Sequence, residues 1–564
     1  MHHHLIMPGL PKRQNHDGFD ALFDQHEADI TSPLLPTKSS ARATMASNIK
    51  YIAPQMDPLA GSSTKAARQS PMRLMIQDAG VLLTMLPYLP NIFLPLKAKD
   101  SSDELYMNVQ GARDMILQGW LMIMETSLLL MAPLALLILP GLVSMTAIAL
   151  YSLTVYLVSW PMEGPDLTYS KMDDTTKAMA EKHRDERWLF VNGTATGHSG
   201  LQKNIDRISK TFGRAIIGIH NKTYGLPADI LECLVQRSFA YKTQDVRVAY
   251  SYVKAVLVDP TVKKVVLIGH SQGGIIVSLV LDELFAELPT SCMSKLEIYT
   301  FGSAASHFSN PLVSSTTEEH SPVSPTSAPA VHFDIPSQPK HVISHIEHYA
   351  NEHDMVPRWG VLHCIQDTLN NRYAGSVFVR MGASGHMFNQ HYMNTMFPLP
   401  EKDAHWMSGS FLDNRVKMDE KLAMKRENMA MSNIGVMRRE GGLEFGDRQV
   451  IQDGMGMMTG SSQTNANTIM TFARTNTGYL LAEEAQGKTV RELSRLWRYL
   501  GGRSPHTPTP FPTMGGEAQW LNGKNDKTQG LKQFTSIPSE ENFLNGKSGK
   551  GQGGKHHRAL TDLS

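Results

Sequence analysis

Between residues 185 and 400, short apolar runs alternate with longer amphipathic stretches, notably 227–258 and 274–288. This pattern predicts strands joined by crossover helices, which is an α/β fold with a mostly parallel sheet and helices on both faces. A stretch rich in Ser, Pro and Thr at 309–340 interrupts the pattern, and we interpret it as a flexible insertion. The candidate strands are residues 188–193, 215–221, 263–269, 295–302, 341–351 and 376–381.

A second hydrophobic pattern precedes this domain. Residues 120–160 contain one charged residue, Glu125, and Pro140-Gly141 divides them into two apolar halves. Each half is long enough to cross about 30 Å of hydrocarbon as a helix. A buried helix pair of a soluble domain normally carries a polar stripe, whereas this segment has little polarity. We therefore expect a transmembrane helical hairpin within a membrane region at 76–165.

The membrane region also holds an apolar stretch at 81–96, which is too short to span a bilayer. Its prolines interrupt a regular helix, so we expect this stretch to lie along the bilayer interface. Basic residues flank the hairpin on both sides, and such residues favour the cytosolic side. The pattern predicts a catalytic domain that faces the cytosol, at the endoplasmic reticulum or a lipid droplet.

Both ends of the chain have compositions typical of disorder. Residues 1–75 are polar with scattered prolines, and we interpret them as a disordered lead. Residues 401–564 form a polar extension that ends in a disordered tail. One helix is expected there, at 489–500, because Thr489 and Glu492 make a capping box. Its arginines suit either docking on the membrane or packing on the catalytic domain.

Charge and cysteine content narrow the function. The 564 residues include 54 basic and 53 acidic side chains, for a formal net charge of +1. This balance supplies no long-range field for a nucleic acid, so we expect no such partner. Three cysteines cannot build a disulfide scaffold, which fits a reducing environment facing the cytosol.

A G-x-S-x-G pattern, Gly269-His270-Ser271-Gln272-Gly273, directly follows an apolar strand candidate and precedes an apolar helix candidate. This is the setting of a nucleophile elbow, in which a sharp turn presents the serine hydroxyl to the substrate. The two glycines leave room where the strand and the helix pass closely. We interpret Ser271 as the nucleophile and the backbone N–H of Gln272 as an oxyanion donor.

The remaining candidates follow other predicted strands. Thr194, after the first strand candidate, is the second candidate oxyanion donor. A serine nucleophile needs a histidine base oriented by a carboxylate, and in this fold the acid precedes the histidine. Asp354, after the fifth strand candidate, is the expected acid, with Glu352 as the alternative. His386, after the sixth, is the expected base, with His391 as the alternative.

A metal site is a competing interpretation of four clustered histidines, His341, His345, His348 and His353. The segment resembles a strand, in which alternate side chains point to opposite faces, and no HExxH motif accompanies it. We therefore expect neither a metal nor a cofactor.

Four motifs in this order resemble those of the class 3 lipases: Gly193-Thr194, GHSQGG at 269–274, TFGS at 300–303, and N-x-x-D-x-V-P-R at 351–358. The overall build is similar to that of a fungal membrane-associated lipase-like serine esterase. The resemblance covers roughly residues 188–395. It implies an acylglycerol or phospholipid ester substrate, with Ser271 as nucleophile and Asp354 as acid.

The sequence as a whole predicts a membrane-anchored serine ester hydrolase of lipids, with an α/β-hydrolase domain at 185–400. An acyltransferase is the alternative enzyme, because it uses the same triad and acyl-enzyme with an alcohol as acceptor. A catalytically silent membrane scaffold on a hydrolase fold is the alternative outside enzymes. An intact triad favours an enzyme.

Overall fold

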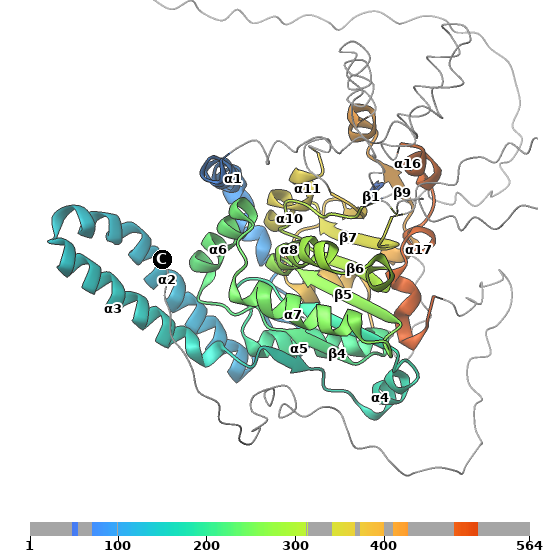
Figure 1. Cartoon of the computed structure of the whole chain (residues 1–564), viewed down its shortest axis with the longest axis horizontal. Coiled ribbons are helices and arrows are strands. Elements are labelled where there is room, and N and C mark those ends of the chain that lie inside the picture. Colours follow the sequence, from blue (N-terminus) through green and yellow to red (C-terminus); the bar gives the residue numbers. More distant parts are fainter. Residues whose placement is uncertain are drawn as a thin grey trace, which may run out of the picture. The chain divides into compact units, whose positions relative to one another are not determined.

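The computed structural model describes residues 48–54, 70–98, 100–311, 313, 341–366, 373–399, 410–426 and 479–505. Its described part contains a nine-stranded sheet in the order β2-β4-β3-β5-β6-β7-β8-β1-β9. Figure 1 shows β5, β6 and β7 side by side in this sheet. The strands are β1 Ile49–Ile52, β2 Leu167–Tyr169, β3 Glu186–Val191, β4 Ile216–Ile219, β5 Lys264–His270, β6 Leu296–Phe301, β7 His345–Asn351, β8 Ser376–Arg380 and β9 Val416–Met418.

Strands β3 to β8 correspond to the six predicted strands, and they run parallel to one another. The sheet is mixed because β2 and β1 pair antiparallel with β4 and β8 at its two sides. Parallel strands place their carboxyl ends at one edge, so the loops after β3, β5, β7 and β8 meet there. These loops contain the predicted catalytic residues.

The sheet has helices on both sides, as an α/β fold requires. In β3, Leu189 and Val191 belong to one buried cluster, and Trp188 and Phe190 belong to the other. The first cluster includes residues of α6 Leu226–Phe239, α7 Gln244–Val258 and α8 Gln272–Glu287, and the second includes α5 His198–Phe212. Burial on both faces explains why the strands are continuous apolar runs.

The predicted disordered lead at 1–75 is wrong for its described residues. β1 pairs with β8 and β9, and Ile49 and Tyr51 are buried. Four residues are too few to show the alternation of a strand, and this segment becomes a strand because it pairs with its neighbours. Helix α1, Pro71–Met85, also begins inside the predicted lead, with Ser70 as its N-cap. Residues 1–47 and 55–69 lie outside the described residues.

The stretch at 81–96, which we expect along the bilayer interface, is partly helical. Residues 81–85 belong to α1, and the 3₁₀ helix η3, Leu86–Ile92, follows at Pro87 and Pro90. Helix α1 contacts α6, and Arg237 of α6 donates from Nε to Asp78 of α1 at 2.7 Å. The outer side chains are exposed and apolar, among them Leu86, Leu89, Phe93 and Leu94.

The predicted hairpin consists of α2, Val109–Ile138, and α3, Gly141–Ser159, which contact each other. Both helices are long and apolar enough to cross a membrane. The core helix of a soluble protein would be mostly buried, whereas only 11% of the most apolar window of each helix is buried. Helix α2 begins at Val109, well before the predicted start, so its first part lies outside the apolar segment.

The predicted single helix at 489–500 is wrong. The capping box of Thr489 and Glu492 is present, but α17 ends at Leu493 and a 3₁₀ segment, η7 Leu496–Gly502, follows. The break occurs where the Arg495 N–H donates to the buried carboxylate of Glu347 at 2.6 Å. A carboxylate that receives backbone N–H groups at this point competes with continuation of the helix.

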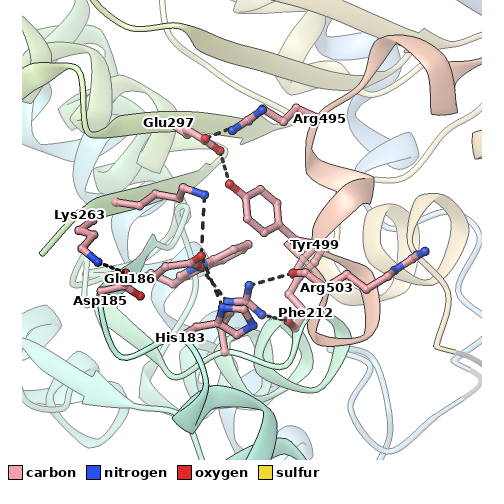
Figure 2. Close-up of polar contacts among 12 residues, drawn as sticks. His183, Asp185, Glu186, Phe212, Lys263, Glu297, Arg495, Tyr499 and Arg503 are labelled. Carbon is pink, nitrogen blue, oxygen red and sulfur yellow. Dashed lines mark hydrogen bonds and ion pairs between the residues drawn. The ribbon is translucent and has the colours of Figure 1, made fainter. Parts of the chain in front are cut away.

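This C-terminal segment packs on the sheet. Arg495 and the Tyr499 hydroxyl donate to the two carboxylate oxygens of Glu297, at 2.9 and 2.7 Å (Figure 2). Arg214 donates to the carbonyl oxygen of Arg503 at 2.8 Å. Of the two alternatives left open for this segment, these contacts favour packing on the catalytic domain. Residues 314–340, 427–478 and 506–564, which include most of the predicted insertion at 309–340 and the predicted tail, lie outside the described part.

Candidate functional site

Ser271 occupies a sharp turn between β5 and α8. Its backbone has φ +58° and ψ −122°, a conformation that L-residues rarely adopt. The Ser271 N–H donates to the Phe301 carbonyl, and the Ala304 N–H donates to the Ser271 carbonyl, both at 3.1 Å. Strain of this kind persists only where the surroundings impose it, and it is typical of functional sites.

The two predicted elbow glycines lie where backbones approach closely. A Cβ on Gly273 would clash with the carbonyl oxygen of Val191 in β3. A Cβ on Gly269 would lie 3.0 Å from the Gly273 carbonyl oxygen. Strand β5, α8 and β3 therefore meet at this turn with no room for a side chain at Gly273 and a tight fit at Gly269.

The structure brings His386 and Asp354 together from the loops after β8 and β7. Nδ1 of His386 lies 2.6 Å from Oδ2 of Asp354. Asp354 is fully buried, and its carboxylate also accepts from the Tyr392 hydroxyl at 2.7 Å and the Val356 N–H at 3.0 Å. Buried carboxylate oxygens need hydrogen-bond donors of this kind. Asp354 therefore fixes the imidazole so that Nδ1 carries a proton.

Tyr392 is a participant that sequence reasoning missed. Burial, followed by the nearby Asp354 charge, raises the pKa of its hydroxyl well above the usual value, so the hydroxyl stays a donor. Nothing in the run FNQHYM distinguishes this tyrosine from an ordinary core aromatic.

The other ring nitrogen of His386, Nε2, is buried and has no hydrogen-bond partner among the described residues. The ring packs against Gly302, where a Cβ would lie 2.9 Å from Cε1 of His386. Gly302 lies between Phe301 and Ala304, which both hydrogen-bond to the Ser271 backbone. The imidazole and Ser271 therefore border the same turn.

His270, the residue before the nucleophile candidate, also holds His386. Its Nε2 lies 2.8 Å from the His386 carbonyl oxygen, which can only accept, so Nε2 is the donor. The two rings stack with centroids 4.7 Å apart. Burial and then the neighbouring His386 depress the pKa of His270 well below its usual value, so it stays neutral.

His391, the alternative base, has both ring nitrogens occupied. The Met387 N–H donates to Nδ1 at 3.0 Å, and Nε2 donates to the Pro95 carbonyl at 2.9 Å. Burial lowers its pKa. Glu352, the alternative acid, accepts from the Gly382 N–H at 2.7 Å and does not partner His386. The arrangement therefore favours His386 and Asp354 over these alternatives.

The loop after β3 lies against Ser271. A Cβ on Gly193 would clash with the Ser271 side chain and lie 3.0 Å from its Oγ. The loop is fixed at its start because the Asn221 N–H donates to Oδ1 of Asn192 at 2.8 Å. Gly193 therefore lies directly against the nucleophile candidate, and Thr194 is the next residue in the chain.

The other oxyanion candidate, Gln272, is the first residue of α8, where backbone N–H groups have no partner within the helix. Its side chain is bound elsewhere. It accepts from Asn221 at 2.8 Å and donates to Glu232 at 3.0 Å. These contacts hold the first turn of the helix in place.

No group of three or more His, Cys, Asp or Glu side chains within the described ranges could hold a metal ion. Among the four clustered histidines, His348 has both nitrogens bound, at 2.7 Å to the Thr300 hydroxyl and at 2.9 Å to the Ala374 carbonyl. His348 is thus a core histidine whose hydrogen bonds are satisfied.

No protein-family model matches the chain, and no curated protein matches it. Among solved structures it is similar to a Trichoderma reesei cutinase in complex with a C11Y4 phosphonate inhibitor, at 20% sequence identity. The match covers 33% of this chain and 75% of that chain, with a TM-score of 0.17. The score is too low to show a common fold, so the function is inferred from this chain's own residues.

Proposed function

We propose that the chain is a serine ester hydrolase of the α/β-hydrolase type. The observation that carries the proposal is His386, whose Nδ1 is held by Asp354 and whose buried Nε2 is unpaired beside the strained Ser271 turn. A base that is held on one side and free on the other can accept the serine proton.

In the proposed reaction, Ser271 Oγ attacks the acyl carbonyl while its proton passes to Nε2 of His386. The carbonyl oxygen becomes an oxyanion, which the N–H groups of Thr194 and Gln272 stabilise. His386 then gives the proton to the departing alcohol, which leaves an acyl-enzyme. Water, activated by His386, attacks the acyl-enzyme and releases the carboxylic acid.

We propose acyl-lipid esters as substrates, because the domain is joined to a hairpin of two exposed, apolar helices. Anchoring in a bilayer would supply such esters at high local concentration. The anchor is tested by extraction of native membranes. Release of the full chain by alkaline carbonate alone would contradict integral insertion, and a requirement for detergent would support it.

The test of the activity is turnover of short-chain and long-chain p-nitrophenyl esters and glycerides by the detergent-solubilised full chain. Wild type is expected to release free acid, and Ser271→Ala is expected to lose turnover. Ser251→Ala, a matched change in α7, serves as the control and retains it. Addition of an acceptor alcohol separates a hydrolase from an acyltransferase, because only the latter directs most of the acyl group to a new ester.

A further inference from the structure

The one charged residue of the apolar hairpin segment contacts the catalytic domain. Glu125 of α2 is buried, and its Oε2 accepts from the Ala228 N–H at 3.1 Å. A Cβ on Gly225 would lie 2.6 Å from both carboxylate oxygens, so Gly225 leaves the space that Glu125 fills. The carboxylate thus caps the N-terminus of α6, where backbone N–H groups need acceptors.

The next residue of α6 holds the loop beside Ser271. Asp229 is buried, and its Oδ2 accepts from the Ala195 N–H at 2.8 Å and from the Thr223 hydroxyl at 2.7 Å. Its Oδ1 accepts from the Tyr224 N–H at 3.1 Å. One carboxylate therefore connects the segment at 193–195 to the turn that precedes α6.

The segment at 193–195 needs such a support. Ala195 has φ +53°, a left-handed conformation that a residue with a Cβ disfavours. The segment lies beyond the end of β3, so no strand pairing holds it. Displacement of Ala195 would move the adjacent N–H of Thr194, and oxyanion donors act only at closely defined positions.

We propose that Asp229 is the positioning residue of the oxyanion segment at 193–195, and that Glu125 makes this support depend on the hairpin. The inference rests on the proposed hydrolase function. It assigns a task in the reaction to two carboxylates that take no part in the proton transfer. It also explains why an otherwise apolar hairpin carries one buried acid.

The test compares Asp229→Ala with Asp229→Asn in the full-length, detergent-solubilised protein. The readouts are kcat and KM on a soluble short-chain ester, the rate of fluorophosphonate labelling, and the melting temperature. Asp229→Ala is expected to lower kcat and the labelling rate by about ten- to a hundred-fold, with KM nearly unchanged, as for an impaired oxyanion hole. Asp229→Asn is expected to recover part of the rate, because its amide oxygen can still accept from Ala195 while its amide nitrogen cannot accept from Tyr224.

A purely structural role would lower the melting temperature of both variants without a specific loss of kcat. Asp245→Asn, which changes another buried carboxylate, on α7, is the control and should keep kcat. The proposal is overturned if folded Asp229→Ala has wild-type kcat, or if Asp229→Asn loses as much as Asp229→Ala. An inactive wild type that also resists labelling would instead contradict the proposed hydrolase function.

If Asp229→Ala fails to fold, two variants of Glu125 test whether the 193–195 segment is supported through α6. Glu125→Ala leaves Asp229 in place and is expected to lower kcat about three- to ten-fold at constant KM, a smaller loss than removal of an oxyanion donor. Glu125→Gln keeps an acceptor for the Ala228 N–H and should stay near wild type. A wild-type kcat for Glu125→Ala would disprove the link between the hairpin and the site.

Discussion

Nδ1 of His386 lies 2.6 Å from Oδ2 of Asp354, and both side chains are buried. An imidazole that gains a proton in such a place becomes a buried cation, which is costly unless an opposite charge is close. Asp354 supplies that charge, and the Tyr392 hydroxyl holds the same carboxylate oxygen at 2.7 Å. In the proposed reaction, Asp354 therefore selects the tautomer of His386 and stabilises its protonated form.

Asp354→Asn should leave the fold intact and lower kcat by roughly 10³- to 10⁴-fold, because an amide can favour the wrong tautomer of the histidine. The measurement is steady-state hydrolysis of a soluble ester. The matched control is Glu352→Gln, which changes the neighbouring carboxylate and should retain most of the activity. A wild-type kcat for Asp354→Asn would remove Asp354 from the mechanism.

His386→Gln and His391→Gln separate the two candidate bases. We expect His386→Gln to lose turnover by at least about 10³-fold, as for removal of a general base in a triad. We expect His391→Gln to stay within a few-fold of wild type, because both His391 nitrogens already bind the backbone. The measurement is kcat of each variant at matched melting temperature. The opposite order would show that His391 is the base.

The elbow glycines should differ in tolerance. Gly273→Ala introduces a Cβ against the Val191 carbonyl oxygen, which is backbone and cannot move aside. Gly269→Ala introduces one 3.0 Å from the Gly273 carbonyl oxygen, a milder conflict. Thermal unfolding should therefore show a larger loss for Gly273→Ala, together with loss of labelling at Ser271. Equal melting temperatures for both variants would contradict the close packing at this turn.

His348 should make the fold less stable in acid. Burial lowers its pKa to about 4, whereas an unfolded histidine takes up a proton near about 6.5. Between these values the unfolded chain binds more protons than the folded chain, so the free energy of unfolding falls as the pH falls. The full contribution is on the order of 3 kcal/mol, at about 1.4 kcal/mol per pKa unit.

His348→Gln should flatten this dependence, since glutamine can donate to the Ala374 carbonyl without titrating. The measurement is the free energy of unfolding in urea across the acid range. His307→Gln is the control, because His307 is partly exposed and pairs with Asp282 at the surface. An unchanged pH dependence in His348→Gln would mean that other groups cause the acid sensitivity.

The central strands could be predicted because burial on both faces leaves a continuous apolar run, as in the strand that ends at His270. The loops that follow such strands could then be ordered, which placed Asp354 and His386 at one edge of the sheet. β1 could not be predicted in this way. Its four residues form a strand through pairing with β8 and β9, which are distant in the sequence.

Tyr392 and Asp229 could not be predicted as supports of the site. Their roles depend on contacts between segments far apart in the chain, of which the local sequence gives no sign. Tyr392 and Asp354 are 38 residues apart, and Ala195 and Asp229 are 34 apart. The break after Leu493 has the same origin, because the Glu347 carboxylate that binds the Arg495 N–H lies 148 residues earlier in the chain. The local helix signals at 489–500 predict the start of the helix correctly, but they carry no information on the distant carboxylate that ends it.

The most direct test of the central claim is fluorophosphonate labelling of the detergent-solubilised full chain, with the modified residue located by peptide mass spectrometry. If Ser271 is the nucleophile, one adduct is expected, on Ser271, that is absent in Ser271→Ala and forms much more slowly in His386→Ala. A folded wild type that remains unlabelled would favour a catalytically silent scaffold, and a label that persists in Ser271→Ala would show that another residue is the nucleophile.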